Sequence, residues 1–165
     1  MSTANPAPAP NMLSDSERKA IEAELPLYER RRSLCIEALK IVQEHRGWVS
    51  DEAVADIAEF LGMGADEVDS VATFYNRIHR HETGRHVIYL CDSVSCWIMG
   101  CDRARERLRE TLGIDFGETT PDGRFTLLPI ACLGACDRAP ALMVGDELYG
   151  PVDPAKAEEP LGKHP

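Results

Sequence analysis

The sequence lacks the features that mark a membrane-spanning protein or an enzyme with its own active site. No run of about 18 apolar residues occurs, so no segment is long enough to cross a membrane as a helix. There is no P-loop, no G-x-G-x-x-G motif after an expected strand, and no Ser/His/Asp arrangement whose spacing favours catalysis. A C-x-x-C pair is absent too, which argues against a disulfide oxidoreductase. We therefore expect a soluble globular chain without direct membrane insertion and without a complete catalytic site.

The first residues lack the signals that direct a protein out of the cytoplasm. They contain neither the basic and apolar segments of a secretory signal nor the arginine that is typical of transit peptides. Residues 1–13 are instead rich in alanine and proline, so we expect a disordered leader. We therefore expect the six cysteines in the reducing cytoplasm, where cysteines bind metal more often than they form disulfides.

Basic patches are missing from a chain whose net charge is −10 at pH 7. The acidic excess is spread over both halves of the sequence rather than collected in one tail. Proteins that bind nucleic acid normally present a basic face or a basic tail to the phosphates. We therefore do not expect nucleic acid as a partner.

The first half of the sequence has the periodicity of amphipathic helices. Helices are expected over four ranges, residues 18–25, 31–45, 51–61 and 65–78. Ser14 and Glu17 have the spacing of a capping box before the first helix, and Ser50 can cap the third. Glycines stand where the second and third helices should end. Four short helices with brief connections predict a helical bundle domain over residues 14–80.

The pattern changes after a polar stretch at residues 77–84, which we expect to be a linker. Beyond it, strands are expected at residues 86–90, 124–130, 141–144 and 147–149. A charged helix is expected at residues 103–112, a hairpin turn at Gly145-Asp146, and a short helix near the C-terminus. This order predicts a thioredoxin-like α/β domain over residues 85–160, which makes the whole chain an α+β protein.

Two cysteine pairs follow the first two expected strands. Cys91 and Cys96 come after the strand at residues 86–90, and Cys132 and Cys136 come after the next strand. If the helix between the strands is a right-handed crossover, the strands are parallel and their carboxyl ends meet at one edge of the sheet. The predicted topology therefore brings the four cysteines to one site, which their spacing alone would not do.

Four thiolates at one site suit either a [2Fe–2S] cluster or a structural zinc ion. Small residues in both cysteine loops allow backbone N–H groups to turn toward the sulfurs. Such donors favour a cluster that gains negative charge on reduction. On the residues alone both metals stay open, so a zinc-bound interaction module without a redox role is the alternative.

The roles of three other residues follow from their surroundings. Cys101 repeats the four-residue gap after Cys96, but residues five apart on a helix point in directions about 140° different. We expect Cys101 to be a packed or partly exposed thiol and Cys35 to be a buried thiol of the helical domain. A thiol-based redox sensor that uses Cys96 and Cys101 stays a third reading. Trp97 can shield the site, contact a partner or pack in the core.

One stretch, residues 122–140, resembles the signature of a known family, the small [2Fe–2S] subunit of respiratory complex I, NADH:quinone oxidoreductase (the E subunit in bacteria). The matching residues are Asp122, Phe125, Thr126, Cys132, Leu133, Gly134, Cys136, Ala139 and Pro140. Residues 71–75, 84–88 and 91–96 also resemble stretches of this family. Cys101 departs from the family pattern.

The resemblance implies a thioredoxin-like ferredoxin domain with one [2Fe–2S] cluster on Cys91, Cys96, Cys132 and Cys136. It implies an oxidoreductase subunit whose cluster exchanges electrons with the FMN of the NADH-binding flavoprotein subunit, so FMN and NADH belong to that partner. Other peripheral-arm subunits of complex I are further expected partners. The location implied is peripheral, on the cytoplasmic face of the bacterial inner membrane. The equivalent subunit of an NAD-linked hydrogenase or formate dehydrogenase is the nearest alternative.

Overall fold

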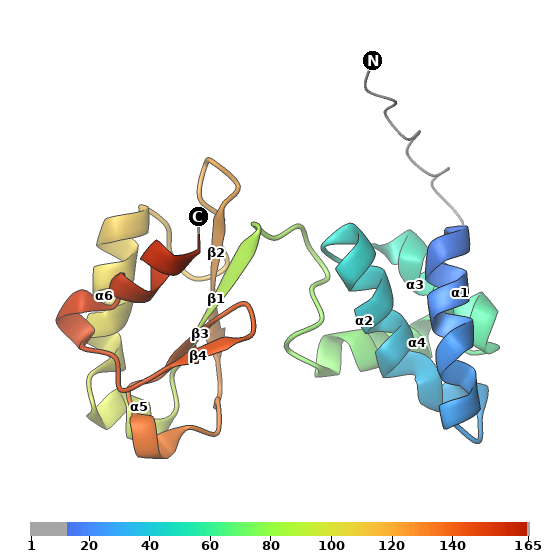
Figure 1. Cartoon of the computed structure of the whole chain (residues 1–165), viewed down its shortest axis with the longest axis horizontal. Coiled ribbons are helices and arrows are strands. Elements are labelled where there is room, and N and C mark those ends of the chain that lie inside the picture. Colours follow the sequence, from blue (N-terminus) through green and yellow to red (C-terminus); the bar gives the residue numbers. More distant parts are fainter. Residues whose placement is uncertain (1–12, 165) are drawn as a thin grey trace. The chain divides into compact units, whose positions relative to one another are not determined.

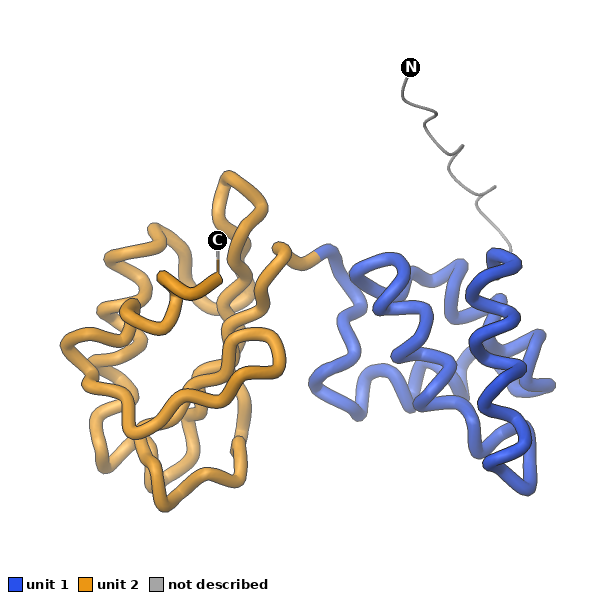
Figure 2. Tube along the Cα trace, in the orientation of Figure 1, with its two compact units in different colours: residues 1–82 blue, residues 83–165 orange. Residues whose placement is uncertain are grey.

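The computed structural model describes residues 13–164, and the chain divides into two compact units between residues 82 and 83. Figure 2 draws the two units in different colours. The expected leader, residues 1–13, lies outside the described residues except for Leu13, which is buried in the helical core. No helix in the described part of the chain is long and apolar enough to cross a membrane.

The first unit, as far as it is described, is a bundle of four α-helices (Figure 1). They are α1 (Asp15–Glu24), α2 (Cys35–Arg46), α3 (Asp51–Leu61) and α4 (Ala65–Phe74). Two 3-10 turns, Leu25–Leu27 and Arg31–Leu34, connect α1 to α2. The predicted capping box before α1 is present, and the Ser50 side chain accepts the Ala53 N–H at the start of α3. Local capping therefore sets these two helix starts.

Two helix boundaries differ from the sequence prediction. The fourth helix ends at Phe74, because Tyr75 leaves the helical conformation (φ −89°, ψ 102°) while its N–H still bonds to the Val71 carbonyl. The second helix begins as a 3-10 turn and becomes α-helical only at Cys35. A 3-10 turn also places residues three apart on one side, so apolar spacing alone does not separate the two helix types.

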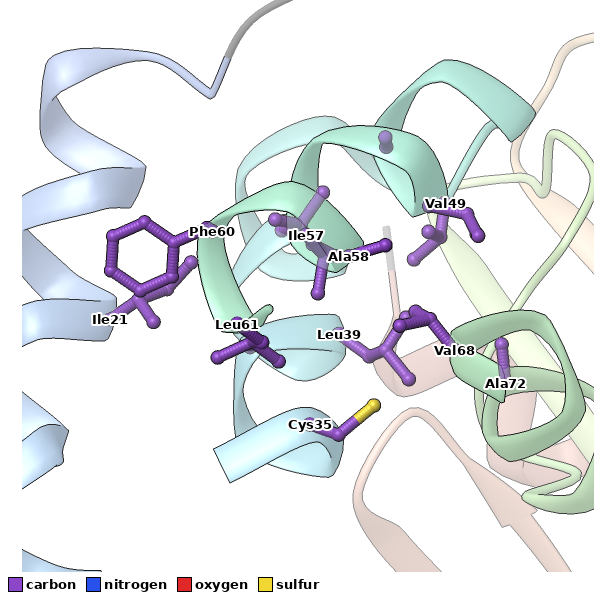
Figure 3. Packing of buried hydrophobic residues seen from close by; sticks show 14 of the residues in the cluster. Ile21, Cys35, Leu39, Val49, Ile57, Ala58, Phe60, Leu61, Val68 and Ala72 are labelled. Atoms are coloured by element: carbon purple, nitrogen blue, oxygen red, sulfur yellow. The ribbon is translucent and has the colours of Figure 1, made fainter. Parts of the chain in front are cut away.

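One hydrophobic core holds the four helices together (Figure 3). Ile21, Leu39, Ile57 and Val68 come from the four different helices, and each is 0% exposed. Burial of one such side chain stabilises a fold by about 1.5–3 kcal/mol. Cys35 lies in the same core as a buried thiol, as predicted.

A buried ion pair joins α1 to α2. The Glu17 side chain is 2% exposed, and its carboxylate accepts hydrogen bonds from Arg46 Nε at 2.6 Å and from Arg46 Nη2 at 2.7 Å. The Ser14 hydroxyl donates a further hydrogen bond to this carboxylate at 2.8 Å. Burial alone would raise the pKa of Glu17, but the hydrogen bonds from Arg46 and Ser14 outweigh it and hold that pKa below its usual value.

The second unit contains a four-stranded mixed sheet in its described residues. The strands are β1 (His86–Cys91), β2 (Phe125–Ile130), β3 (Leu142–Val144) and β4 (Glu147–Tyr149). Their order is β2-β1-β3-β4, with β1 parallel to β2 and the other neighbours antiparallel. The hairpin between β3 and β4 turns at Gly145-Asp146, as predicted. The α+β class predicted from the sequence is confirmed.

Helical segments connect the strands and cover the sheet (Figure 1). After β1 come α5 (Val94–Ile98) and α6 (Cys101–Leu112), and α6 provides the crossover to the parallel strand β2. After β4, two 3-10 turns, Pro154–Lys156 and Glu159–Lys163, replace the single short helix expected there. The predicted strand–helix–strand crossover is confirmed, whereas α5 was not predicted.

Side chains of β1 alternate between two apolar clusters. Ile88 and Leu90 pack with Leu108 of α6, whereas Tyr89 and Cys91 belong to a second cluster. Successive side chains of a strand point to opposite faces of a sheet, so the two clusters lie on its two faces. Cys91 therefore faces away from the core that α6 covers.

The outer edge of β2 has its backbone N–H groups occupied. Phe125 N–H donates to Thr120 Oγ1 at 3.0 Å, and Leu127 N–H donates to the Glu118 carbonyl at 3.1 Å. The next position on this edge is Pro129, which has no N–H. No further strand of the described sheet pairs with this edge of β2. The segment before β2 accepts the hydrogen bonds of its N–H groups instead.

We predict that Arg46→Met lowers the free energy of unfolding at pH 7 by about 3 kcal/mol, because it leaves the buried Glu17 carboxylate without a cation. Urea unfolding of the full chain, followed by far-UV circular dichroism, measures this loss. A carboxyl group whose pKa is lowered by folding contributes its full stability at pH values above its usual pKa of 4.5. That contribution is lost as the pH falls through the pKa of the folded state. The difference between wild type and variant should therefore shrink in acid.

The matched control is Lys40→Met, which removes an exposed ion pair with Glu37. We expect this variant to change the free energy of unfolding by no more than about 0.5 kcal/mol. Equal losses in the two variants would show that the burial of Glu17 does not determine the effect.

Candidate metal centre

Cys91 is the last residue of β1 and lies at the carboxyl edge of the sheet. Its partner in the parallel pairing is Ile130, the last residue of β2. Both strands therefore end at the same edge, as predicted, and Cys132 follows shortly after Ile130. The Cys91 side chain is buried at 2% exposure and packs in one cluster with Ile130.

Cys96 lies on α5, the short helix that was not predicted. Its side chain is 1% exposed, and its thiol forms a hydrogen bond with the Cys91 thiol. Ser93, the residue before α5, brings its hydroxyl to 3.6 Å from Cys91 Sγ. Cys91 and Cys96 are therefore a contacting pair of buried thiols.

Cys132 and Cys136 lie in the loop that follows β2, and both are exposed. Gly134 between them has φ +71°, a backbone conformation that glycine adopts without strain. This turn brings the Gly134 N–H to 3.3 Å from Cys132 Sγ, to which it donates. Cys136 then begins the 3-10 turn Cys136–Arg138.

Backbone hydrogen bonds tie the chain after β2 to the buried pair. The N–H of Leu133, the residue after Cys132, donates to Cys91 Sγ. The N–H of Ala141, further along the chain, donates to Cys96 Sγ. Figure 1 shows α5 and the loop after β2 at the same end of this unit. The exposed pair is thus on a loop that is held against the buried pair.

The surroundings shift the pKa values of the two buried thiols in opposite directions. Burial would raise the pKa of Cys91, but hydrogen bonds from Ser93, from the Leu133 N–H and from Cys96 outweigh it and lower that pKa. Burial raises the pKa of Cys96, and the neighbouring Cys91 adds to this rise. The environment of Cys91 therefore stabilises a negatively charged sulfur, the form that binds metal.

The predicted ligands form two pairs rather than one closed group. Among residues 13–164, no three His, Cys, Asp or Glu side chains come together closely enough to hold a metal ion. Their chemistry nevertheless fits a [2Fe–2S] cluster, because the two cysteine pairs follow strands that end at one sheet edge and N–H groups donate to three of the four sulfurs.

Comparison with known proteins identifies the family. A family model described as thioredoxin-like [2Fe–2S] ferredoxin matches residues 21–164. The chain belongs to this family. One [2Fe–2S] cluster, the cofactor expected from the sequence, is the cofactor of this ferredoxin family, and the thioredoxin-like fold of the second unit is confirmed with it.

Relatives of this ferredoxin match nearly its whole length. The E subunit of NADH-quinone oxidoreductase from Pseudomonas aeruginosa is 52% identical over 143 residues, which cover 87% of this chain and 86% of the relative. The protein of the same name from Escherichia coli (strain K12) is 49% identical over 152 residues, 92% of each chain. These relatives confirm the resemblance seen at residues 122–140.

A solved structure shares the ferredoxin's fold over part of its length. The NAD+-reducing [NiFe]-hydrogenase in its H2-reduced state aligns with a TM-score of 0.63 at 23% identity. The alignment covers 76% of this chain and 21% of the hydrogenase chain. At this identity the likeness concerns the fold alone, and it shows that the fold also occurs as one section of a larger chain.

Cys101 is a packed thiol beside the ferredoxin site, one of the two roles expected for it. It begins α6, is 3% exposed and shares a cluster with Cys91 and Cys96. Burial, assisted by the charge of Asp102 and by the nearby Cys96, raises the pKa of Cys101 to about 11. Cys101 thus lies among apolar neighbours, at the start of a helix rather than in a loop.

Two features of the site were missed because their signals are weak or absent. A helix of five residues, Val94–Ile98, is too short to show a helical period, although Ser93 before it is a residue type that often precedes helices. Small residues in the cysteine loops indicated N–H donors in general, but no residue pattern identified Leu133 and Ala141 as the donors. The direction of a backbone N–H depends on the loop dihedral angles, which residue type does not determine here.

We predict that the cysteines of the metal-free full chain are alkylated at different rates, according to how deeply each is buried. With limiting iodoacetamide, the exposed Cys132 and Cys136 should react about tenfold faster than the buried Cys101. Peptide mass spectrometry after timed quenching measures each rate. Cys35, which is buried in the other unit, is the matched control and should be as slow as Cys101. Equal rates at Cys101 and Cys132 would contradict the packed position of Cys101.

Proposed function

We propose that this chain holds its [2Fe–2S] cluster on Cys91, Cys96, Cys132 and Cys136 and works as the electron-transfer subunit of an NADH:quinone oxidoreductase. The relatives at about half identity are E subunits of that oxidoreductase. The chain is an oxidoreductase subunit rather than a complete enzyme. Its own residues supply thiolate ligands, N–H donors, exclusion of water and a surface for a partner.

One contact supports this ligand set most directly, the hydrogen bond from Leu133 N–H to Cys91 Sγ. It joins the loop that carries Cys132 and Cys136 to the strand end that carries Cys91. Cys91 in turn contacts Cys96. This backbone contact thus holds the loop of one proposed ligand pair against the other pair, although the two pairs lie far apart in the sequence.

The protein tunes the site through hydrogen bonds and burial. When bound, the cluster supplies one-electron redox chemistry. N–H groups of Leu133, Gly134 and Ala141 donate to ligand sulfurs and stabilise the negative charge that those sulfurs carry. The buried side chains of Tyr89 and Ile130 exclude water from the inner side. Four thiolates without histidine give a potential far below that of Rieske centres.

The immediate partner in this proposal is the NADH-binding flavoprotein subunit. FMN and NADH bind to that subunit, and the cluster of this chain exchanges electrons with its FMN. Other peripheral-arm subunits complete the assembly on the cytoplasmic face of the inner membrane. Electron tunnelling falls steeply with distance, so stable association with the flavoprotein is part of the function.

The same observations support two other functions less well. One is the equivalent subunit of an NAD-linked hydrogenase or formate dehydrogenase; the NAD+-reducing [NiFe]-hydrogenase shares the fold at 23% identity, whereas the oxidoreductase subunit is 52% identical. A zinc-bound interaction module would use the same thiols. The ferredoxin family of this chain carries iron and sulfide instead.

The cluster itself is tested on the full chain purified without oxygen. We expect two irons and two sulfides per chain, absorption in the visible range, and an EPR signal of one [2Fe–2S] cluster after reduction with dithionite. The signal arises because reduction leaves one unpaired electron on the iron pair. A colourless protein that contains zinc and gives no signal after dithionite would refute the electron-carrier function.

Single substitutions test the ligand set. Cys96→Ala and Cys132→Ala should each lower the iron and sulfide content per chain at least about fivefold, because each removes one thiolate from the cluster. Cys101→Ala is the matched control and should retain the wild-type content and EPR signal. The ligand set is wrong if Cys101→Ala loses the cluster while Cys96→Ala keeps it.

A further inference from the structure

Ser93 stands at the start of α5 but does not cap that helix with its side chain. It has the extended backbone of a residue that precedes a helix (φ −67°, ψ 163°), and its carbonyl accepts the Trp97 N–H at 2.8 Å. A serine in this position usually turns its hydroxyl onto the first N–H groups of the helix. The Ser93 side chain makes no such hydrogen bond. Its hydroxyl is therefore directed elsewhere.

The Ser93 hydroxyl lies against the sulfurs of the buried thiol pair. Its oxygen is 3.6 Å from Cys91 Sγ, and the hydroxyl also forms a hydrogen bond with Cys96 Sγ. The backbone N–H of Ser93 donates to Cys91 Sγ as well. One residue thus contacts two of the four proposed ligands, through both its main chain and its side chain.

The direction of the hydroxyl hydrogen bond follows from the charge of the sulfurs. A cysteine that binds iron has lost its proton, so its sulfur can only accept a hydrogen bond, whereas a serine hydroxyl can donate or accept. With the cluster bound, the Ser93 O–H must therefore be the donor. A donor to a ligand sulfur stabilises the reduced cluster, which is the more negative form, and so raises the reduction potential.

The environment of the two sulfurs strengthens this effect. Cys91 and Cys96 are 2% and 1% exposed, and they share an apolar cluster with Tyr89 and Ile130. A hydrogen bond inside a protein is electrostatically stronger than the same bond in water. The loss of one donor from these sulfurs should therefore change the potential measurably, because little solvent can replace it.

We propose that the Ser93 hydroxyl sets part of the reduction potential of the [2Fe–2S] cluster. This inference rests on the proposed function and adds a residue that acts on the cluster through two of its ligands. Because the hydroxyl caps no helix and contacts both sulfurs, its position suits the cluster rather than the stability of α5.

A matched pair of variants of the full, cluster-loaded chain tests the proposal. Ser93→Ala removes the hydroxyl at the sulfurs. Ser95→Ala makes the same change two residues further along, at a half-buried serine whose side chain has no hydrogen bond within residues 13–164. A redox titration followed by EPR measures the midpoint potential. At the wild-type midpoint, the ratio of reduced to oxidised cluster should fall at least fivefold in Ser93→Ala, which is about 40 mV for a one-electron couple. Ser95→Ala should stay within about twofold of wild type.

Ser93→Thr distinguishes loss of the hydroxyl from other effects of the substitution. Threonine keeps the hydroxyl and is well accepted at a helix start, so its redox ratio should stay within about twofold of wild type. A potential that falls equally in Ser93→Ala and Ser93→Thr would assign the effect to packing and overturn the inference. An unchanged potential in a cluster-loaded Ser93→Ala chain overturns it as well, but leaves the proposed function intact.

A second variant decides if Ser93→Ala does not retain the cluster. Ser93→Gly also removes the hydroxyl, and glycine is tolerated before a helix, so this variant should bind the cluster and show the same lowered potential. If neither variant holds iron while Ser93→Thr does, the hydroxyl is needed for cluster assembly and the inference is wrong. A wild-type chain without iron and sulfide, or without an EPR signal after dithionite, refutes the proposed function itself.

Discussion

The parallel pairing of β1 with β2 is the constraint on which the cysteine site depends. Its register sets Cys91 opposite Ile130, so both strands end at one edge of the sheet. A shift of one residue in β1 would turn Cys91 toward the face where Ile88 and Leu90 pack against α6. Burial of apolar side chains on both faces therefore fixes the register, and the register fixes the positions of Cys91 and of the loop that follows Ile130.

Much of the fold could be predicted because its signals are local. The capping box at Ser14 and the cap at Ser50 lie beside the helices that they start, and the strand–helix–strand order determines parallel strands. The glycines that end the second and third helices, Gly47 and Gly62, were predicted as well, but the end of the fourth helix was not. Apolar spacing continues to Ile78, yet the helix stops at Phe74 and Ile78 reaches the core from a non-helical segment. Tertiary packing can use an apolar residue without keeping it helical.

The site could be predicted in outline but not in detail. Residue types and family resemblance indicated the four cysteines, and chain topology correctly predicted that β1 and β2 end at one edge of the sheet. The contact from Leu133 to Cys91 depends on loop dihedral angles, so no residue pattern reveals it. The role of Trp97 was equally open in the sequence, because an aromatic residue beside a cysteine suits a core, a shield or an interface. Its 60% exposure in the fold excludes core packing.

The hydrogen bonds along the outer edge of β2 affect how the protein enters an assembly. An unpaired strand edge is a template for β-augmentation by a neighbouring chain. Here Thr120 and Glu118 accept the outward N–H groups, and Pro129 offers none, so an incoming strand would find no donors along the described edge. Association at the β2 edge must therefore use side-chain surfaces. The same hydrogen bonds keep this edge from acting as a template for polymerisation in the interval between synthesis of the chain and its incorporation into a larger complex.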